Sequence, residues 1–99
     1  MSVKTEFRKE EIEAFCRRHH IRKLALFGSV LRDDFSPESD VDVLVEFERG
    51  HTPGLAFFAM QRELSEILGR KADLNTAMDL SPYFRQEVID EAEVLHVTT

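Results

Sequence analysis

Two aspartates separated by one residue, Asp40 and Asp42, open an apolar stretch of the chain and could bind a divalent cation. Side chains of an extended strand alternate between its faces, so these two carboxylates point to the same side. Like charges this close repel, and one carboxyl group tends to keep its proton. A cation removes that conflict, and Mg²⁺ favours carboxylates, water and substrate phosphates as ligands. The pair therefore predicts a magnesium site.

A glycine–serine turn precedes the aspartates and could hold phosphate. Gly28 and Ser29 directly follow the apolar run 24–27. Glycine lets a ligand approach the backbone closely, amides at the start of the next helical turn can donate to an anion, and the Ser29 hydroxyl can add a hydrogen bond. Alone, a Gly-Ser pair is usually a turn and an Asp-x-Asp pair is usually solvated. In this order, the two predict a phosphate cradle beside a metal.

The combination of Gly28-Ser29, Arg32 and the run Ser39-Asp40-Val41-Asp42 resembles the nucleotidyltransferase superfamily of the DNA polymerase beta type. In its small size and in the residues of both motifs, the chain resembles the minimal branch of this superfamily, the MNT proteins. These are commonly antitoxins of HEPN/MNT toxin–antitoxin pairs. The resemblance covers about residues 21–97. Many relatives carry Ala-Arg-Gly where this chain has Leu31-Arg32-Asp33, which changes the turn after Arg32 and not the metal ligands.

The resemblance also assigns roles to individual residues. It implies that the catalytic metal ligands are Asp40, Asp42 and Asp73, and that the nucleotide-binding residues are Gly28, Ser29, Arg32 and Ser39. Considered alone, Asp73 in its short strand would be an ordinary charge on an edge strand. Arg32 could neutralise phosphate, and a structural pairing with a loop carboxylate such as Asp40 is an equal alternative.

The function implied by the resemblance is transfer of AMP from ATP, with Mg²⁺, to a tyrosine hydroxyl of a HEPN ribonuclease toxin. Larger nucleotidyltransferases use a second domain to complete base and acceptor binding. We therefore expect a homodimer or a hetero-oligomer with the toxin to supply those surfaces. Two alternatives stay open: an antitoxin with a silent site that neutralises by binding alone, and, less favoured, a nucleotidyltransferase acting on a small molecule.

Composition limits the class of protein. The 99 residues predict one domain, 1–99, with one modest core. The net charge of −6 argues against nucleic acid as a direct ligand. The single cysteine, Cys16, fits a small core residue in a cytoplasmic protein, and the four histidines show no metal spacing with it. His51 is interpreted as a solvated loop residue, and no segment suggests a membrane span.

The pattern of apolar residues predicts the elements that position these motifs. Three helices are expected. The first covers 5–19 and has Thr5 as its N-cap, and the second covers 54–68 and ends before Gly69. The third begins at Ser81-Pro82. Strands are expected at 21–27, 40–47 and 71–75, and a short final strand at 94–97 is left open. The fold class is α/β or α+β: a small mixed sheet flanked by helices, which the resemblance implies to be the nucleotidyltransferase palm.

Overall fold

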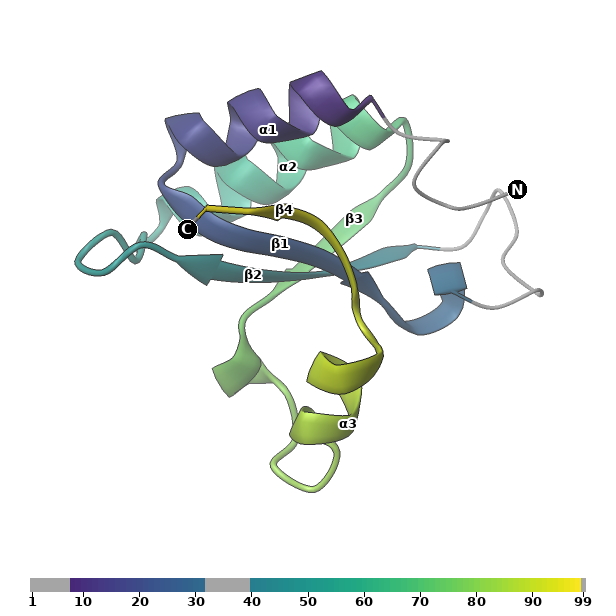
Figure 1. Cartoon of the computed structure of the whole chain (residues 1–99). Coiled ribbons are helices and arrows are strands. Elements are labelled where there is room, and N and C mark those ends of the chain that lie inside the picture. Colours follow the sequence, from purple (N-terminus) through teal and green to yellow (C-terminus); the bar gives the residue numbers. More distant parts are fainter. Residues whose placement is uncertain (1–7, 32–39, 99) are drawn as a thin grey trace.

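The computed structural model describes residues 8–31 and 40–98, which form a four-stranded sheet with three α-helices (Figure 1). The elements in chain order are α1 (Lys9–Arg18), β1 (Ile21–Phe27), the 3₁₀ turn η2 (Gly28–Leu31), β2 (Val41–Phe47), α2 (Ala56–Leu68), β3 (Ala72–Asn75), the 3₁₀ turn η3 (Ala77–Asp79), α3 (Arg85–Glu91) and β4 (Glu93–Val97). No helix in the described part of the chain is both long and apolar enough to cross a bilayer.

The sheet is mixed, with strand order β3-β2-β1-β4. The central strands β1 and β2 are antiparallel, and β4 is antiparallel to β1 on the outer side. β3 runs parallel to β2, which is possible because α2 carries the chain back along the sheet between them. This confirms the expected small mixed sheet with helices.

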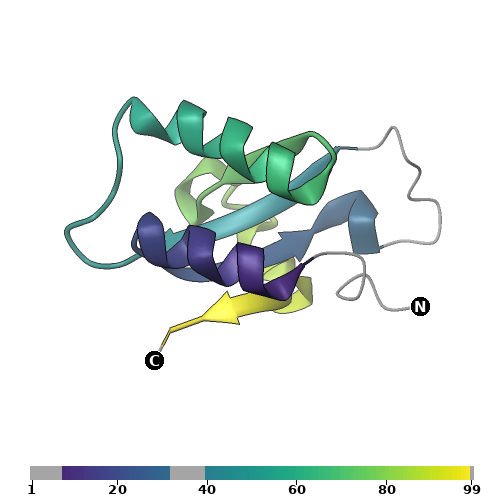
Figure 2. The same cartoon turned by 90° about the horizontal axis from the view of Figure 1, so that it is seen from above.

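One face of the sheet carries α1 and α2, which lie side by side across it (Figure 2). Between the helices and the sheet lies the core, which combines alternate residues of the strands with the apolar faces of both helices: Ile12, Phe15, Cys16, Ile21, Leu24, Leu26, Val41, Val43, Val45, Met60, Leu64, Leu68, Ala72 and Leu74. Burial raises the pKa of the Cys16 thiol to about 12, so this cysteine is the inert core residue that its position predicts.

A charged contact joins the two helices across the top of the core. Glu63 on α2 forms an ion pair with Arg18 at the end of α1 and accepts a hydrogen bond from His19 Nε2 at 2.9 Å. Burial alone would raise the pKa of Glu63, but the hydrogen bonds from His19 and Arg18 outweigh it and hold the pKa below its usual value. The basic end of α1 is therefore a structural contact with α2.

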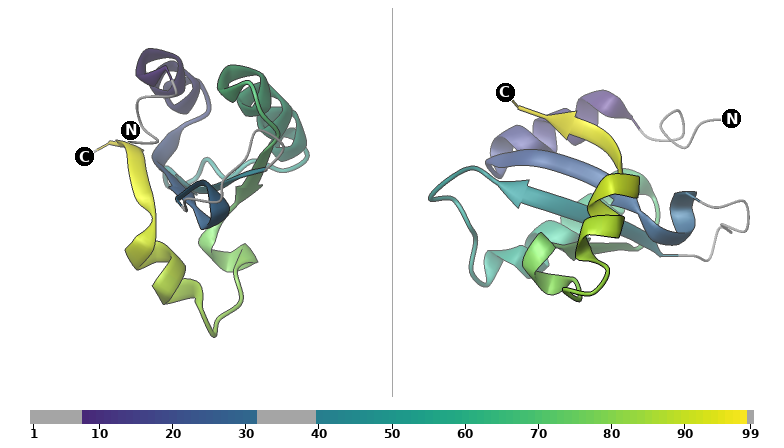
Figure 3. Two further views of the ribbon diagram at one scale, coloured as in Figure 1. Left: turned by 90° about the vertical axis from the view of Figure 1, so that its right-hand side faces the viewer. Right: turned by 60° about the horizontal axis from the view of Figure 1, so that its bottom comes forward.

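The other face of the sheet is covered only in part. α3 and η3 lie below it, on the side away from α1 and α2, as the end-on view shows (Figure 3). The alternation that sends Val41, Val43 and Val45 into the core places Asp42 and Leu44 on this second face. The aspartates therefore lie on the more open side of the sheet.

Two helix starts differ from the sequence-based expectation. Arg8 has an extended backbone, so α1 begins at Lys9 and not at residue 5; Thr5 itself lies outside the described residues. The last helix begins at Arg85, because Ser81 and Pro82 belong to a turn in which the Phe84 amide donates to the Ser81 carbonyl at 3.2 Å. A Ser-Pro pair suits a turn as well as a helix start, and here the turn prevails.

The other elements match their predicted positions closely. β1 has the predicted bounds, β2 begins one residue late, and α2 begins at Ala56. α2 ends at Leu68, where Gly69 takes a φ of +70°, so the predicted glycine stop is confirmed. The final strand is present as Glu93–Val97 and forms an edge of the sheet.

Candidate active site

Asp42 and Asp73 face each other across the junction of β2 and β3. The register pairs Asp42 with Asp73, Val41 with Ala72 and Val43 with Leu74. Paired residues of neighbouring strands point to the same face of a sheet, and the apolar partners occupy the core face. The two aspartates therefore lie side by side on the open face of the sheet.

Gly28 closes the site from the β1 side. Phe27, the last residue of β1, pairs with Asp42, and Gly28 follows it with a φ of +76°. A Cβ at this position would overlap Oδ2 of Asp42 and would lie 3.3 Å from its Cγ. Position 28 therefore requires glycine for two reasons: its backbone is left-handed, and the Asp42 carboxylate approaches it closely.

Asp40 directly precedes β2 and is exposed to solvent. Its Oδ2 lies 3.8 Å from Lys71 Nζ, a loose ion pair between two exposed side chains. The Lys71 carbonyl also accepts the Val41 amide at 2.8 Å, which joins the start of β2 to the start of β3. Lys71 is thus a cation beside the site that sequence reasoning did not single out.

The electrostatics of the site centre on Asp42. Partial burial raises the pKa of Asp42 above its ordinary value, and the negative charges of Asp73 and then Asp40 raise it further. The shift shows that the three carboxylates interact unfavourably through space. A site with three neighbouring negative charges gains from a bound cation or from a proton on one of them.

The donor set fits Mg²⁺, since Asp42 and Asp73 offer hard oxygen ligands on one face and Asp40 offers a third carboxylate directly before β2. The ligand oxygens of Asp40, Asp42 and Asp73 do not all approach within 4.8 Å of one another, whereas another group in the described residues does.

The position of Asp73 depends on α2. β3 is an edge strand, and two of its amides bind side chains of that helix: the Ala72 amide donates to Ser65 Oγ at 2.8 Å and the Leu74 amide donates to Gln61 Oε1 at 2.9 Å. The Ser65 hydroxyl in turn donates to the Gln61 carbonyl at 2.8 Å. These bonds cap the free edge of β3 and fix its register against β2.

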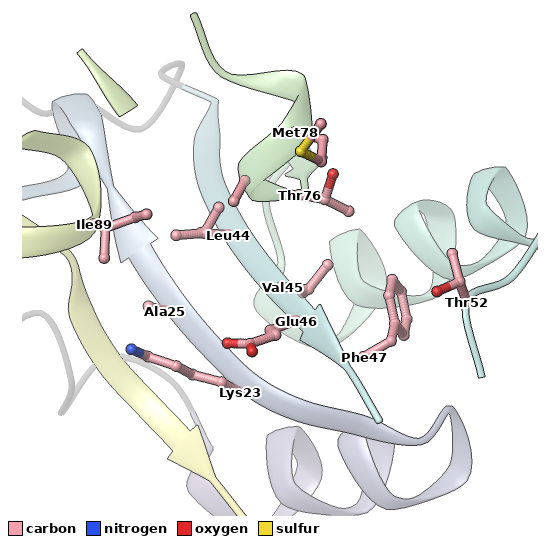
Figure 4. Close-up of a pocket in the computed structure, with 11 residues that line it drawn as sticks. Lys23, Ala25, Leu44, Val45, Glu46, Phe47, Thr52, Thr76, Met78 and Ile89 are labelled. Carbon is pink, nitrogen blue, oxygen red and sulfur yellow. The ribbon is translucent and has the colours of Figure 1, made fainter. Parts of the chain in front are cut away.

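A pocket of about 460 Å³ lies over β1 and β2, and none of the aspartates lines it (Figure 4). Its floor includes Ala25 and Leu44, the latter two residues after Asp42, and Met78 and Ile89 border it from η3 and α3. Lys23 and Glu46 form its polar end. Its largely apolar walls suit a planar aromatic group, and no sequence pattern indicated it because its walls come from four separate elements.

Of the other residues predicted for the nucleotide site, the structure describes only one. Ser29 lies in η2 directly after Gly28, as expected for the turn. Arg32 and Ser39, predicted to bind nucleotide, lie outside the described residues. The alternative pairing of Asp40 with Arg32 therefore stays a prediction.

A palm-like mixed sheet with an acidic pair beside a glycine turn is the arrangement of a nucleotidyltransferase. The chain matches the family model described as "Nucleotidyltransferase domain" over residues 8–95. It therefore belongs to the nucleotidyltransferase domain family, and it is a nucleotidyltransferase.

Relatives with close to a third of their residues identical cover most of the chain. Protein adenylyltransferase MntA of Thermococcus cleftensis is 33% identical over 91 residues, which are 91% of this chain and 86% of that protein. A Methanocaldococcus jannaschii protein named as a candidate protein adenylyltransferase is 31% identical over 84 residues, which are 85% of this chain and 89% of that one.

Solved structures agree with the fold. A structure described as that of a candidate minimal nucleotidyltransferase is 34% identical, with a TM-score of 0.73 over 93% of this chain and 94% of that one. A toxin–antitoxin complex with AMP-PNP has a TM-score of 0.74 at 21% identity, covering 94% of this chain and 76% of that one. At that identity the second likeness shows the shared fold alone.

Proposed function

We propose that this nucleotidyltransferase is an antitoxin that uses Mg²⁺ to transfer AMP from ATP to a tyrosine hydroxyl of a HEPN ribonuclease toxin. The observation that carries the proposal is the pairing of Asp42 with Asp73 on the open face of the sheet, directly beside Gly28. Support also comes from relatives named as protein adenylyltransferases, at 31% and 33% identity.

In this mechanism Asp40, Asp42 and Asp73 would hold the metal, which when bound neutralises the triphosphate and assists the attacking hydroxyl. The backbone amides at Gly28 and Ser29 would receive the β- and γ-phosphates, since amides at the start of a helical turn can donate to an anion. Arg32 and Ser39 are proposed to complete the nucleotide site. The acceptor oxygen bonds to the α-phosphorus, the bond to the β-phosphate oxygen breaks, the hydroxyl proton is released, and pyrophosphate leaves.

The choice of acceptor rests on a complex that contains a similar fold. This neighbour, at 20% identity and a TM-score of 0.67, is a complex of the tri-AMPylated Shewanella oneidensis HEPN toxin with an MNT antitoxin. In this chain, the large side chains of Met78, Tyr83 and Phe84 are exposed on the segment that borders the pocket. Exposed apolar groups near a site suit contact with a folded partner, which would position its hydroxyl for attack.

AMP on the toxin would inhibit it for a physical reason. A phosphodiester adds negative charge and bulk near the surface where a ribonuclease must receive RNA phosphates. Inhibition would then follow from repulsion as well as from occlusion.

The test is intact-mass spectrometry of a HEPN ribonuclease toxin, after incubation with this chain, ATP and Mg²⁺. We expect added AMP units on the partner, absent with Asp42→Asn and retained with Asp90→Asn, which removes an exposed charge from α3. A partner that is inhibited but unmodified would refute the transfer and favour an antitoxin that neutralises by binding alone. AMP transferred to a small molecule and not to the partner would favour the third function.

A further inference from the structure

Three side chains that could bind a metal gather at the end of the sheet opposite the aspartates. They are His20, Glu48 and His51, and their ligand atoms all lie within 4.8 Å of one another. His20 joins α1 to β1, while Glu48 and His51 follow β2 in the loop to α2, at the left in Figure 1. Since each central strand has seven residues, about 20 Å of sheet separates this group from Asp42.

The backbone holds the three residues together independently of their side chains. The Glu48 amide donates to the His20 carbonyl at 2.8 Å, and the His51 amide donates to the Glu48 carbonyl at 3.0 Å. His20 also takes a φ of +55°, a left-handed conformation that is uncommon for a residue with a Cβ. The junction before β1 and the loop after β2 are therefore fixed against each other at this point.

The two imidazoles are stacked, with ring centroids 3.9 Å apart and ring planes at 18°. A metal lies in the plane of each imidazole that binds it, so one ring must turn out of the stack for both to bind a single ion. His20 and His51 are exposed, so solvent leaves room for that turn. The carboxylate of Glu48 lies within the same radius as the two rings, so the group offers an oxygen ligand beside two ring nitrogens.

Two imidazoles and one carboxylate form a donor set for Zn²⁺, Co²⁺ or Ni²⁺, whereas Mg²⁺ favours oxygen ligands alone. We propose that His20, Glu48 and His51 bind one such transition-metal ion, at a site separate from the magnesium site of the transfer reaction. Water would complete the coordination, since the group is open to solvent. The ion would tie the start of β1 to the loop that leads into α2.

The test uses protein without a histidine tag, titrated calorimetrically with ZnCl₂ in excess Mg²⁺, and with CoCl₂ followed by visible absorption. We expect one equivalent of either metal to bind and to raise the unfolding temperature. His51→Ala should weaken zinc binding at least about tenfold. Removing a residue that only hydrogen-bonds to a metal ligand already lowers metal affinity by about that factor, and His51 is a proposed ligand itself. His20→Asn, which tolerates the left-handed backbone, should do the same.

His96→Ala is the matched control, because this histidine lies on β4 and contacts Thr98. It should bind zinc as tightly as the parent protein, and Asp42→Asn should also retain the ion. The proposal is overturned if the parent protein binds no zinc or cobalt, if His51→Ala binds them as tightly as the parent, or if Asp42→Asn abolishes binding, which would place the ion among the aspartates.

Discussion

At the scale of single residues, the ionised form of Asp42 lowers the stability of the metal-free protein, although the proposed metal site needs that form. Its pKa lies above the ordinary value of 3.8 because of partial burial and then the charges of Asp73 and Asp40. The folded protein therefore holds this proton more tightly than the unfolded chain does. Stability from this group is greatest at low pH and decreases as the pH rises through the folded pKa.

Asp42→Asn should raise the stability of the metal-free protein at neutral pH while removing Mg-ATP binding. The gain should be under about 1 kcal/mol, because solvent still screens the carboxylate. Thermal unfolding in EDTA from acidic to neutral pH measures it, and the advantage over the parent should shrink as the pH falls. Asp90→Asn is the control for loss of one charge, and an equal gain there would contradict the explanation.

Gly28→Ala should disturb the site more than its effect on the backbone alone can explain. The added Cβ meets Asp42 Oδ2 and also occupies a φ of +76°, which costs about 1–2 kcal/mol for a residue with a side chain. Gly50 has a similar φ of +83°, and a Cβ added there would have no atom within 4 Å, so Gly50→Ala carries the backbone cost alone.

Calorimetric titration of both variants with Mg-ATP separates these two effects. Gly50→Ala should lose stability and keep its affinity for Mg-ATP, whereas Gly28→Ala should lose both. Equal affinity in the two variants would show that the approach of Asp42 to Gly28 is unimportant for the site.

At the scale of elements, β3 depends on α2 for its position. Ser65→Ala would leave the Ala72 amide without its hydrogen bond, which costs about 1–3 kcal/mol for a partly buried group. We expect lower thermal stability and faster hydrogen exchange at Ala72 and Leu74. Ser81→Ala is the control, because that hydroxyl accepts a long 3.4 Å bond in an exposed turn. Unchanged exchange in Ser65→Ala would mean that β2 alone fixes β3.

The sequence predicted most elements because their apolar patterns are local. The runs in β1 and β2 and the stripe of α2 with its Gly69 stop are readable without tertiary information. The predicted start of α3 was wrong, because Ser81-Pro82 is compatible with both a turn and a helix and the choice depends on contacts made elsewhere. Arg85 Nη2, for instance, donates to the Leu80 carbonyl at 3.1 Å across that turn.

The candidate site was predictable to the extent that its residues follow motifs. The place of Asp42 on the open face follows from the strand pattern, whereas Asp40 directly precedes β2. The pairing of Asp73 with Asp42 depends on a register that no local pattern determines. Lys71, the pocket and the His20–His51 stack were missed for the same reason. Each of them joins segments that are distant in the sequence, and histidine spacing gave no signal of a shared group.

At the scale of the whole molecule, Glu63 adds a charged contact between α1 and α2, which already share one core. Its pKa is held below the usual 4.5, since the hydrogen bonds from His19 and Arg18 outweigh the effect of burial. The folded state therefore binds this proton less tightly than the unfolded chain. Stability from the contact is present above about pH 4.5 and is lost as the pH falls through the folded pKa, the opposite of the effect at Asp42.

Glu63→Gln should lower stability at neutral pH by under about 1 kcal/mol, because Arg18 is largely exposed. The difference from the parent should vanish in acid, as the parent carboxylate takes up its proton. Urea unfolding at several pH values measures this difference. Glu66→Gln, an exposed neighbour on α2, should change little at any pH. A destabilisation of Glu63→Gln that is constant with pH would indicate lost packing and not lost charge.

The outer position of β4 has a consequence for how the protein is made. Lys23 pairs with Val97 and Leu26 pairs with Glu93, so β1 borders a strand that the ribosome synthesises after the other strands of the sheet. Until then, one edge of β1 keeps unpaired amides and carbonyls and can recruit a foreign strand. A chain truncated before residue 93 would leave that edge open. Pairing of β4 with β1, and not only folding of the earlier elements, therefore closes this side of the central strands.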